Sequence, residues 1–244
     1  MITKEQILNL SRFYQIDTFT ILREYLQLVF LDNLYRMKGM NKIFFKGGTA
    51  IRILFGSPRF SEDLDFSTTY PINKIKEVVK KIEVEIQKEI PSLKILPLYS
   101  GQETERFRIK YEGKEVKYPL TIRLDFHRVK KIGKTKTSAI KTKFPIIVFP
   151  LITHLTAEEI LKEKIEALID RVKGRDFFDV WYLLEKKVPL PKKIPKNRLL
   201  EKIKQTSEKK LIIDLTPFLP KNQRGILKSL KRRLMENLIN KYGD

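Results

Sequence analysis

Three aspartates in two short segments are the residues best suited to chemistry. Asp63 and Asp65 stand two positions apart in the segment SEDLDFS, and Asp125 lies in the segment TIRLDFHR. Residues two apart on a strand point to the same face, and two close carboxylates repel each other unless a cation lies between them. Carboxylates are ligands that Mg²⁺ and Mn²⁺ prefer. We therefore predict that Asp63, Asp65 and Asp125 are catalytic and hold Mg²⁺ or Mn²⁺, with two ions expected because paired ions suit phosphoryl transfer.

A glycine pair lies shortly before the first two aspartates. Gly47, Gly48 and Thr49 follow the apolar run NKIFF and precede residues that favour a short helix. A strand, two glycines and a helix present backbone N–H groups at a helix N-terminus, which favours phosphate binding. The motif lacks the Gly-Lys-Ser/Thr ending of a P-loop. Taken alone, the glycines could form a simple turn and the aspartates a solvated strand edge. Together, in this order, they favour a site for a metal and a nucleotide.

Composition limits both the ion and the partner. The 244 residues include no cysteine and only two histidines, so a site rich in Cys or His is excluded. The 50 Lys and Arg residues against 29 Asp and Glu give a net charge of +21, which favours a polyanion such as nucleic acid or a nucleotide. No apolar stretch is long enough to span a membrane, and the first residues lack the apolar core of a signal peptide. We therefore expect a cytoplasmic protein with no membrane partner.

The elements that must position these residues predict an α+β fold. Apolar residues at helical spacing predict helices over residues 3–38, with Asp17 as a cap, and over residues 72–90. Short strands are expected in the segments NKIFF, LDF, ERFRIKYEG and VKYPLTIRLDFHRV, and the remainder from Thr156 onward is helical in pattern. We expect a small mixed sheet flanked by helices in residues 1–150 and a helical domain in residues 151–244.

The strand that carries Asp125 has two distinct faces. Strand periodicity places Asp125 on one face with Arg123 and His127. The intervening apolar residues Leu124 and Phe126 then face the core. Asp125 is therefore expected to reach the same ions as the first two aspartates.

The stretch FFKGGTAIRILFGSPRFSEDLDFS resembles the nucleotidyltransferase signature of the polymerase-β-like superfamily, in which Gly-Gly or Gly-Ser precedes Asp-x-Asp or Asp-x-Glu. More closely, it resembles the AbiEii/AbiGii toxin family, whose pattern Lys-Gly-Gly-Thr-x-Leu is followed by Arg-x-Ser-x-Asp-Ile-Asp. Ile51 takes the place of the leucine, and Arg59 and Ser61 stand where the family has them. IRLDF is similar to the strand with the family's third acid, and AEEILKEKIEALIDRVKGRDFFDVWYLL resembles its helical motif. The resemblance extends over residues 20–185.

This resemblance implies a minimal nucleotidyltransferase core with an added helical domain that completes the active site. It implies transfer of an NMP from an NTP with Mg²⁺ or Mn²⁺, and binding of the triphosphate by Gly47, Gly48, Thr49 and Ser61. Several members of the family are toxins of toxin–antitoxin or phage-defence systems, and some related toxins add nucleotides to the 3′ end of tRNA. A cognate antitoxin protein is therefore a candidate partner.

A second set of candidate site residues lies in the helical segment. Lys164 and Arg171 are seven apart and share a helix face, and Asp176 stands near the start of the next helix. The resemblance implies that Lys164 stabilises the departing pyrophosphate and that Arg171 contributes to nucleotide binding. It also implies that Asp176 is an active-site residue, which would orient Lys164 or the nucleotide. The residues alone leave three alternatives open: a solvated lysine, a helix cap at Asp176, and a structural ion-pair network with Arg175 and Asp179.

The predicted reaction is metal-dependent transfer of an NMP to an acceptor hydroxyl, which Asp125 helps to deprotonate. The positive charge favours RNA as the acceptor, with tRNA the first candidate. Its phosphates would be held by a basic loop at residues 128–143 and by the segment RGILKSLKRRL. One alternative is an enzyme that modifies protein hydroxyls. Another is a non-catalytic basic RNA-binding protein on the same fold, which the presence of all three acids disfavours.

Overall fold

The computed structural model describes residues 1–146, 151–171 and 173–242. The contacts between its residues divide the chain into two compact units. Unit 1 comprises Met1–Gly56 and Phe60–Leu155, and unit 2 comprises Ser57–Arg59 and Thr156–Asp244. The predicted domain boundary between residues 150 and 151 falls at the edge of a range that the structure does not describe, and it stays a prediction.

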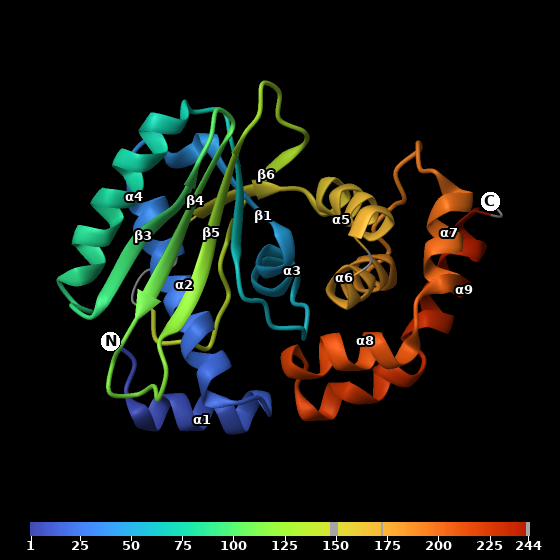
Figure 1. The fold of residues 1–244 in the computed structure, drawn as a ribbon, viewed down its shortest axis with the longest axis horizontal. Helices are drawn as coiled ribbons and strands as arrows, with labels where there is room; N and C mark the ends of the chain where they lie inside the picture. The colour runs from blue at the N-terminus through green and yellow to red at the C-terminus, as the bar shows by residue number, and fades with distance from the viewer. Residues whose placement is uncertain (147–150, 172, 243–244) are drawn as a thin grey trace. The chain divides into compact units, whose positions relative to one another are not determined.

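Unit 1 is built on a mixed sheet that has seven strands in the described residues (Figure 1). The strands are β1 (Ile43–Lys46), β2 (Leu64–Thr68), β3 (Leu93–Ser100), β4 (Thr104–Tyr111), β5 (Leu120–Arg128), β6 (Thr135–Ala139) and β7 (Leu151–Leu155). Their spatial order is β3-β4-β5-β2-β1-β7-β6. Strand β2 runs parallel to β5 and β1 runs parallel to β7, whereas the other neighbours are antiparallel. The predicted α+β class is confirmed.

Two helices of unit 1 occupy most of the stretch that is predicted to be helical over residues 3–38. The helices of this unit are α1 (Lys4–Tyr14), α2 (Thr18–Arg36), α3 (Gly47–Phe55) and α4 (Ile72–Gln87), with a short 3₁₀ helix η1 (Met40–Lys42). Helix α1 ends because Gln15 adopts a left-handed conformation with φ 53°. Asp17 caps α2 by accepting a hydrogen bond from the backbone nitrogen of Thr20 at 2.8 Å, which confirms the predicted cap.

One face of the sheet is apolar and packs against α2 and α4. The rings of Phe66 in β2 and Phe126 in β5 stack with centroids 4.7 Å apart. Phe30 of α2 and Phe45 of β1 lie beside Phe66, and all four rings are fully buried. Buried and solvent-facing residues alternate along β5, so its polar residues occupy the opposite face. The predicted split of this strand into a core face and a polar face is confirmed.

Three strands, β3, β6 and β7, are not predicted from the sequence. Both edges of the sheet are among them, and each carries residues that obscure the strand pattern. In β3 the pairing with β4 shifts between Pro97 and Tyr99, and a proline is tolerated on an edge strand. Strand β6 lies inside the expected basic loop 128–143, whose Lys and Arg residues are all exposed. The loop prediction is therefore wrong for residues 135–139, because an exposed, polar edge strand resembles a loop in sequence.

Unit 2 is helical, as predicted for the chain from Thr156 onward. Its helices are α5 (Ala157–Arg171), α6 (Gly174–Glu185), α7 (Lys196–Gln205), α8 (Glu208–Leu215) and α9 (Leu230–Tyr242), with 3₁₀ helices η2 (Thr216–Phe218) and η3 (Lys221–Lys228). Helix α6 has more buried residues than its neighbour α5, and it packs against α5, α8 and α9. Across the described residues of both units, no helix combines the length and the apolar character needed to cross a membrane.

Candidate active site

A row of charged residues crosses the polar face of the sheet in unit 1. The strand register pairs Lys46 of β1 with Asp65 of β2, Asp65 with Asp125 of β5, and Asp125 with Arg106 of β4. Residues paired directly across neighbouring strands point to the same face. The row therefore reads cation, carboxylate, carboxylate, cation, and it brings two of the three predicted acids side by side.

Arg123 connects the third acid to this row. Its guanidinium contacts Asp63 through Nη2 at 2.9 Å and Asp125 through Nε at 3.1 Å. Arg106 adds a contact of 2.5 Å between its Nε and Oδ1 of Asp125. The carboxylate side chains of Asp63 and Asp125 are 22% and 20% exposed, and the two arginine side chains are 47% and 48% exposed. The acids therefore form a partly solvated cluster. Each of the charges in these contacts has a partner, and solvent can still reach the paired groups.

The glycine segment before the acids holds them in place. Gly47, the first residue of α3, has φ 78°, in the left-handed region that favours glycine. A Cβ atom at Gly47 would lie 2.1 Å from Oδ2 of Asp65, so the absence of a side chain lets the carboxylate approach the backbone. Gly48 and Thr49 are buried, and the Thr49 hydroxyl donates a hydrogen bond to the backbone oxygen of Asp63. The segment thus positions both acids, and its predicted contact with a triphosphate stays a prediction.

Ser61, the other residue predicted to bind the triphosphate, lies between the glycine segment and β2. Its side chain is half-buried, and its backbone oxygen accepts a hydrogen bond of 3.1 Å from the Gln27 amide. This contact anchors the chain just before Asp63 to helix α2. The predicted role of the Ser61 hydroxyl also stays a prediction.

The chemistry of the acid cluster fits a hard divalent ion. Its donors are carboxylate oxygens on neighbouring chain segments, and they are partly open to solvent, as Mg²⁺ and Mn²⁺ sites require. Nowhere in the described residues do three His, Cys, Asp or Glu side chains lie as close together as metal ligands would. Arg123 contacts both Asp63 and Asp125, so the residues fit a metal in type and neighbourhood once this arginine leaves a carboxylate.

The second predicted set lies in unit 2, in a buried ion-pair network. Lys164 Nζ contacts Oδ2 of Asp179 at 2.8 Å and Oδ1 of Asp176 at 3.3 Å. Asp179 also accepts hydrogen bonds of 2.8 and 2.9 Å from Arg59, and Asp176 accepts bonds of 2.8 and 3.0 Å from Arg171. Both carboxylates are 0% exposed. These mutual contacts favour the structural interpretation of the set, and its predicted roles toward a nucleotide stay predictions.

Electrostatics keep this network charged despite its burial. Burial acts to lower the pKa of Lys164, but the carboxylates of Asp179 and Asp176 outweigh it and raise that pKa above its usual value. Burial acts to raise the pKa of Asp179, but Arg59 and Lys164 outweigh it and hold that pKa below its usual range. The charged forms of Lys164 and Asp179 are therefore stabilised by their partners, and removing Asp179 leaves two buried cations with one carboxylate fewer.

Three basic residues that pair with the acids of these clusters are not predicted as their partners from the sequence: Lys46, Arg59 and Arg106. The alternation in ERFRIKY places Arg106 on a polar strand face, so that signal was present. The pairing of Lys46 with Asp65 depends on strand order, which spacing does not reveal. The resemblance to the family gives Arg59 only a position in its pattern, and the hydrogen-bonding partner of Arg59 lies 120 residues away. Nothing in the local sequence indicates that this arginine is 1% exposed.

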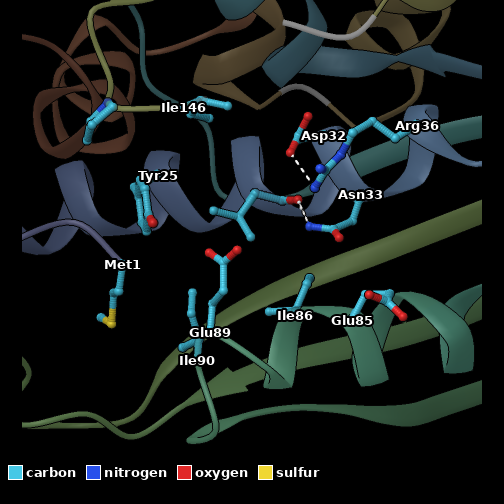
Figure 2. A pocket seen from close by; sticks show the side chains of 12 residues that line it. Met1, Tyr25, Asp32, Asn33, Arg36, Glu85, Ile86, Glu89, Ile90 and Ile146 are labelled. Carbon is cyan, nitrogen blue, oxygen red and sulfur yellow. Dashed lines mark hydrogen bonds and ion pairs between the residues drawn. The ribbon is translucent and has the colours of Figure 1, made fainter. Parts of the chain in front are cut away.

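A separate pocket in unit 1, of about 260 Å³, contains none of the predicted site residues. It lies between α2 and the end of α4, and Figure 2 shows Asp32, Glu85 and Glu89 around it. Arg36 is ion-paired with Asp32 at 2.8 Å. Burial raises the pKa of Asp32, although Arg36 acts to lower it. With three acids against one arginine, this pocket disfavours a triphosphate, and the candidate active site remains the acid cluster on the sheet.

Comparison with known protein families gives a match over most of the chain. The sequence model of the family described as "Nucleotidyl transferase AbiEii toxin, Type IV TA system" matches residues 29–242. The match includes the glycine segment, the three acids and the charged residues of α5 and α6. A search of curated proteins found no significant match.

Solved structures with the same fold are also found. The protein JHP933 from Helicobacter pylori has a TM-score of 0.62 and 22% identity, covering 93% of this chain and 94% of that one. A putative nucleotidyltransferase from H. pylori has a TM-score of 0.65 and 22% identity, with 92% and 95% covered. MenT4, a nucleotidyltransferase toxin from Mycobacterium tuberculosis H37Rv, has a TM-score of 0.60 and 16% identity, with 98% and 89% covered. At such identities the likeness shows a shared fold.

Proposed function

Since the chain belongs to the AbiEii family of nucleotidyltransferase toxins of type IV toxin–antitoxin systems, we propose that its transfer reaction depends on Mg²⁺ or Mn²⁺ and modifies RNA. The donor is an NTP, the transferred group is an NMP, and the first candidate for the acceptor is the 3′ end of tRNA. The protein would act in the cytoplasm, restrained by a cognate antitoxin.

One observation carries the metal dependence. Asp65 and Asp125 are direct neighbours in a parallel strand pair, and Asp63 lies within the span of one guanidinium from Asp125. Two carboxylates on directly paired residues, such as Asp65 and Asp125, favour a shared cation. All three carboxylates are half-buried, so solvent reaches each of them. The site is therefore suited to exchange one cation for another.

Each residue has a defined part in the proposed reaction. Asp63, Asp65 and Asp125 would hold the ions, which when bound supply positive charge to the phosphates. Gly47, with the backbone N–H groups at the start of α3 and the Ser61 hydroxyl, would bind the triphosphate. The acceptor oxygen forms a bond to the α-phosphorus as the bond to the β-phosphate oxygen breaks and pyrophosphate leaves. Asp125 would accept the proton of the attacking hydroxyl.

RNA is the favoured acceptor because of where the positive charge lies. The Lys and Arg residues of 128–143 are all exposed, and those in 224–234 are all exposed or half-buried. Exposed basic side chains bind phosphates without reading sequence, and binding through them weakens steeply as salt is raised. A protein acceptor would not need a net charge of +21.

A labelling assay tests the proposal. The full-length protein is incubated with each α-labelled NTP in turn, with Mg²⁺ or Mn²⁺, and with total tRNA. Asp63→Ala is the test variant. Asp170→Ala, which removes an exposed acid of α5, is the matched control. We expect label on RNA with wild type and with the control, and none with Asp63→Ala or with EDTA.

The other outcomes separate the alternatives. Label found only on protein would identify a protein-modifying enzyme and contradict the RNA acceptor. RNA binding with no label from any NTP or metal would favour a non-catalytic protein. Label that persists with Asp63→Ala would contradict the assignment of the acid cluster.

A further inference from the structure

Arg123 holds a place in the candidate site that the proposed reaction leaves unexplained. It lies on the polar face of β5, and it contacts the carboxylates of Asp63 and Asp125 with two different nitrogens. These are two of the three acids that would bind metal. A divalent ion and this guanidinium therefore compete for the same oxygens.

The charge balance of the cluster shows why this competition is decisive. Asp63, Asp65 and Asp125 carry three negative charges, and Lys46, Arg106 and Arg123 lie in contact or in direct strand register with them. The cluster is thus neutral without a metal. Adding a divalent ion while every basic residue stays in place would bring like charges together, which is unfavourable. At least one basic side chain has to move away from the carboxylates.

Arg123 is the residue best placed to move. Its side chain is 48% exposed, so water replaces its partners at little cost, and exposed ion pairs contribute little to stability. Arg106 is comparably exposed, but it contacts a single acid, and its guanidinium also lies 5.5 Å from the ring centroid of Tyr99. Arg123 bridges two of the proposed ligands, Asp63 and Asp125.

We propose that Arg123 is a positioning residue with two successive partners, an inference that rests on the proposed function. Without metal it neutralises Asp63 and Asp125 and keeps the acids together. When a divalent ion takes those carboxylates, the released guanidinium binds the triphosphate of the incoming NTP. A planar guanidinium pairs with phosphate as well as with carboxylate, because both present two oxygens to its paired N–H groups.

This arrangement predicts opposite effects on two binding steps. Removing Arg123 removes the competitor, so the ion alone binds about three- to tenfold more tightly, as expected for the loss of two exposed ion pairs. The same change removes a phosphate contact, so the nucleotide binds about tenfold or more weakly to the metal-loaded protein. A purely structural arginine would not give shifts of opposite sign.

The experiment measures both steps with the full chain. Mn²⁺ binding is followed by the electron paramagnetic resonance signal of free Mn²⁺. Binding of α,β-methylene analogues of the four NTPs is measured by calorimetry at saturating Mn²⁺. The variants are Arg123→Gln and Arg123→Lys. The matched control is Arg108→Gln, since Arg108 is exposed and lies directly opposite Arg123 in the ladder between β4 and β5. Thermal unfolding verifies that each variant folds.

The expected result is tighter Mn²⁺ binding and weaker nucleotide binding with Arg123→Gln, little change with Arg108→Gln, and intermediate values with Arg123→Lys. The variant Asp65→Asn separates a failure of the proposed metal site from a failure of the proposed role of Arg123. If Asp65→Asn abolishes Mn²⁺ binding while Arg123→Gln shifts both affinities in the same direction, or neither, the metal site stands and the proposal for Arg123 is overturned. If wild type binds no Mn²⁺, the metal dependence of the proposed function fails, and the proposal for Arg123 fails with it.

Discussion

Two clusters in this chain contain the same types of side chain, aspartates and basic residues, but differ in how far those side chains are buried. On the sheet of unit 1, Arg106 and Arg123 are about half exposed and their carboxylate partners are about one-fifth exposed. In unit 2, Arg59 and Asp179 are 1% and 0% exposed. Exposed pairs contribute ~0–1 kcal/mol and exchange partners readily. Breaking a buried pair costs ~3–5 kcal/mol, because a charge is left without a partner.

This difference teaches that burial, more than residue type, separates a site from a support. An acid that must exchange an arginine for a metal ion needs solvent access and weak pairs, which the sheet cluster has. An acid that holds helices together needs buried partners, which Asp179 has in Arg59 and Lys164. The comparison makes each cluster's response to mutation predictable, in activity for the first and in stability for the second.

The largest effect is expected in activity when Asp125 is changed. Asp125→Asn keeps the shape of the side chain but removes a metal-binding charge and a proton acceptor. We expect transfer to fall at least about 10³-fold, equivalent to ~4 kcal/mol of transition-state stabilisation. The free energy of unfolding should change by less than about 1 kcal/mol. Steady-state labelling and urea unfolding measure the two quantities, and a large loss of stability would break the comparison.

The next effect is expected in stability when Asp179 is changed. Asp179→Ala leaves Arg59 and Lys164 buried with one carboxylate fewer. We expect the free energy of unfolding to fall by ~3–5 kcal/mol. Asp170→Ala is the control, because the Asp170 side chain is 73% exposed and its ion pair with Arg198 is long, at 3.9 Å. Equal effects of the two variants in urea unfolding would contradict the structural role of the network.

A smaller effect is expected in the acid dependence of stability. The pKa of Asp179 is held below its usual value in the folded chain, so its contribution is fully present above the pKa of an unfolded aspartate, about 3.9. The contribution is lost as the pH falls through that value toward the folded pKa. Stability should therefore decline between about pH 5 and pH 3 more steeply in wild type than in Asp179→Asn. Urea midpoints at a series of pH values give the slopes, and parallel slopes would contradict the shift.

The smallest effect is expected for Arg171, which lies between the two settings. Its side chain is 53% exposed, although its partner Asp176 is buried. Lys164 remains beside Asp176 in Arg171→Ala, so we expect a loss of about 1 kcal/mol or less in the free energy of unfolding. A loss of transfer activity without a larger loss of stability would support the prediction that Arg171 contributes to nucleotide binding. If Arg171→Ala lowers the free energy of unfolding as much as Asp179→Ala does, the exposure of a side chain does not by itself predict the stability effect of its ion pair.

Local periodicity is enough to predict which residues face outward. The alternation in TIRLDFHR placed Asp125 on the polar face of its strand, and the capping pattern located Asp17 at the start of a helix. Both features depend on residues within a few positions of one another. The choice of acids could be made in this way, because their spacing and the apolar residues beside them are local.

Long-range pairing is what the sequence does not reveal. Asp65 lies beside Asp125 only because β2 pairs with β5, and strand order is set by packing of the whole sheet. Arg59 pairs with Asp179 across 120 residues, and an arginine in a loop is ordinarily exposed. The contact of Arg106 with Asp125 also depends on strand order, and so does that of Arg123 with Asp63, whereas Arg123 and Asp125 share a face of one strand. Sequence spacing therefore selects the candidate acids and places Arg123 beside Asp125, whereas the pairing of Arg106 and Arg59 with carboxylates is found only in the fold.

The close contact between Gly47 and Asp65 affects how a mutational scan of this protein should be interpreted. A side chain at position 47 meets both an unfavourable backbone angle and a carboxylate 2.1 Å from its Cβ. Every substitution there would displace Asp65, whether or not the backbone at 47 ever touches a phosphate. In a library of toxic and non-toxic variants, intolerance at position 47 would thus report on the acid, and evidence for nucleotide contact would have to come from its neighbours.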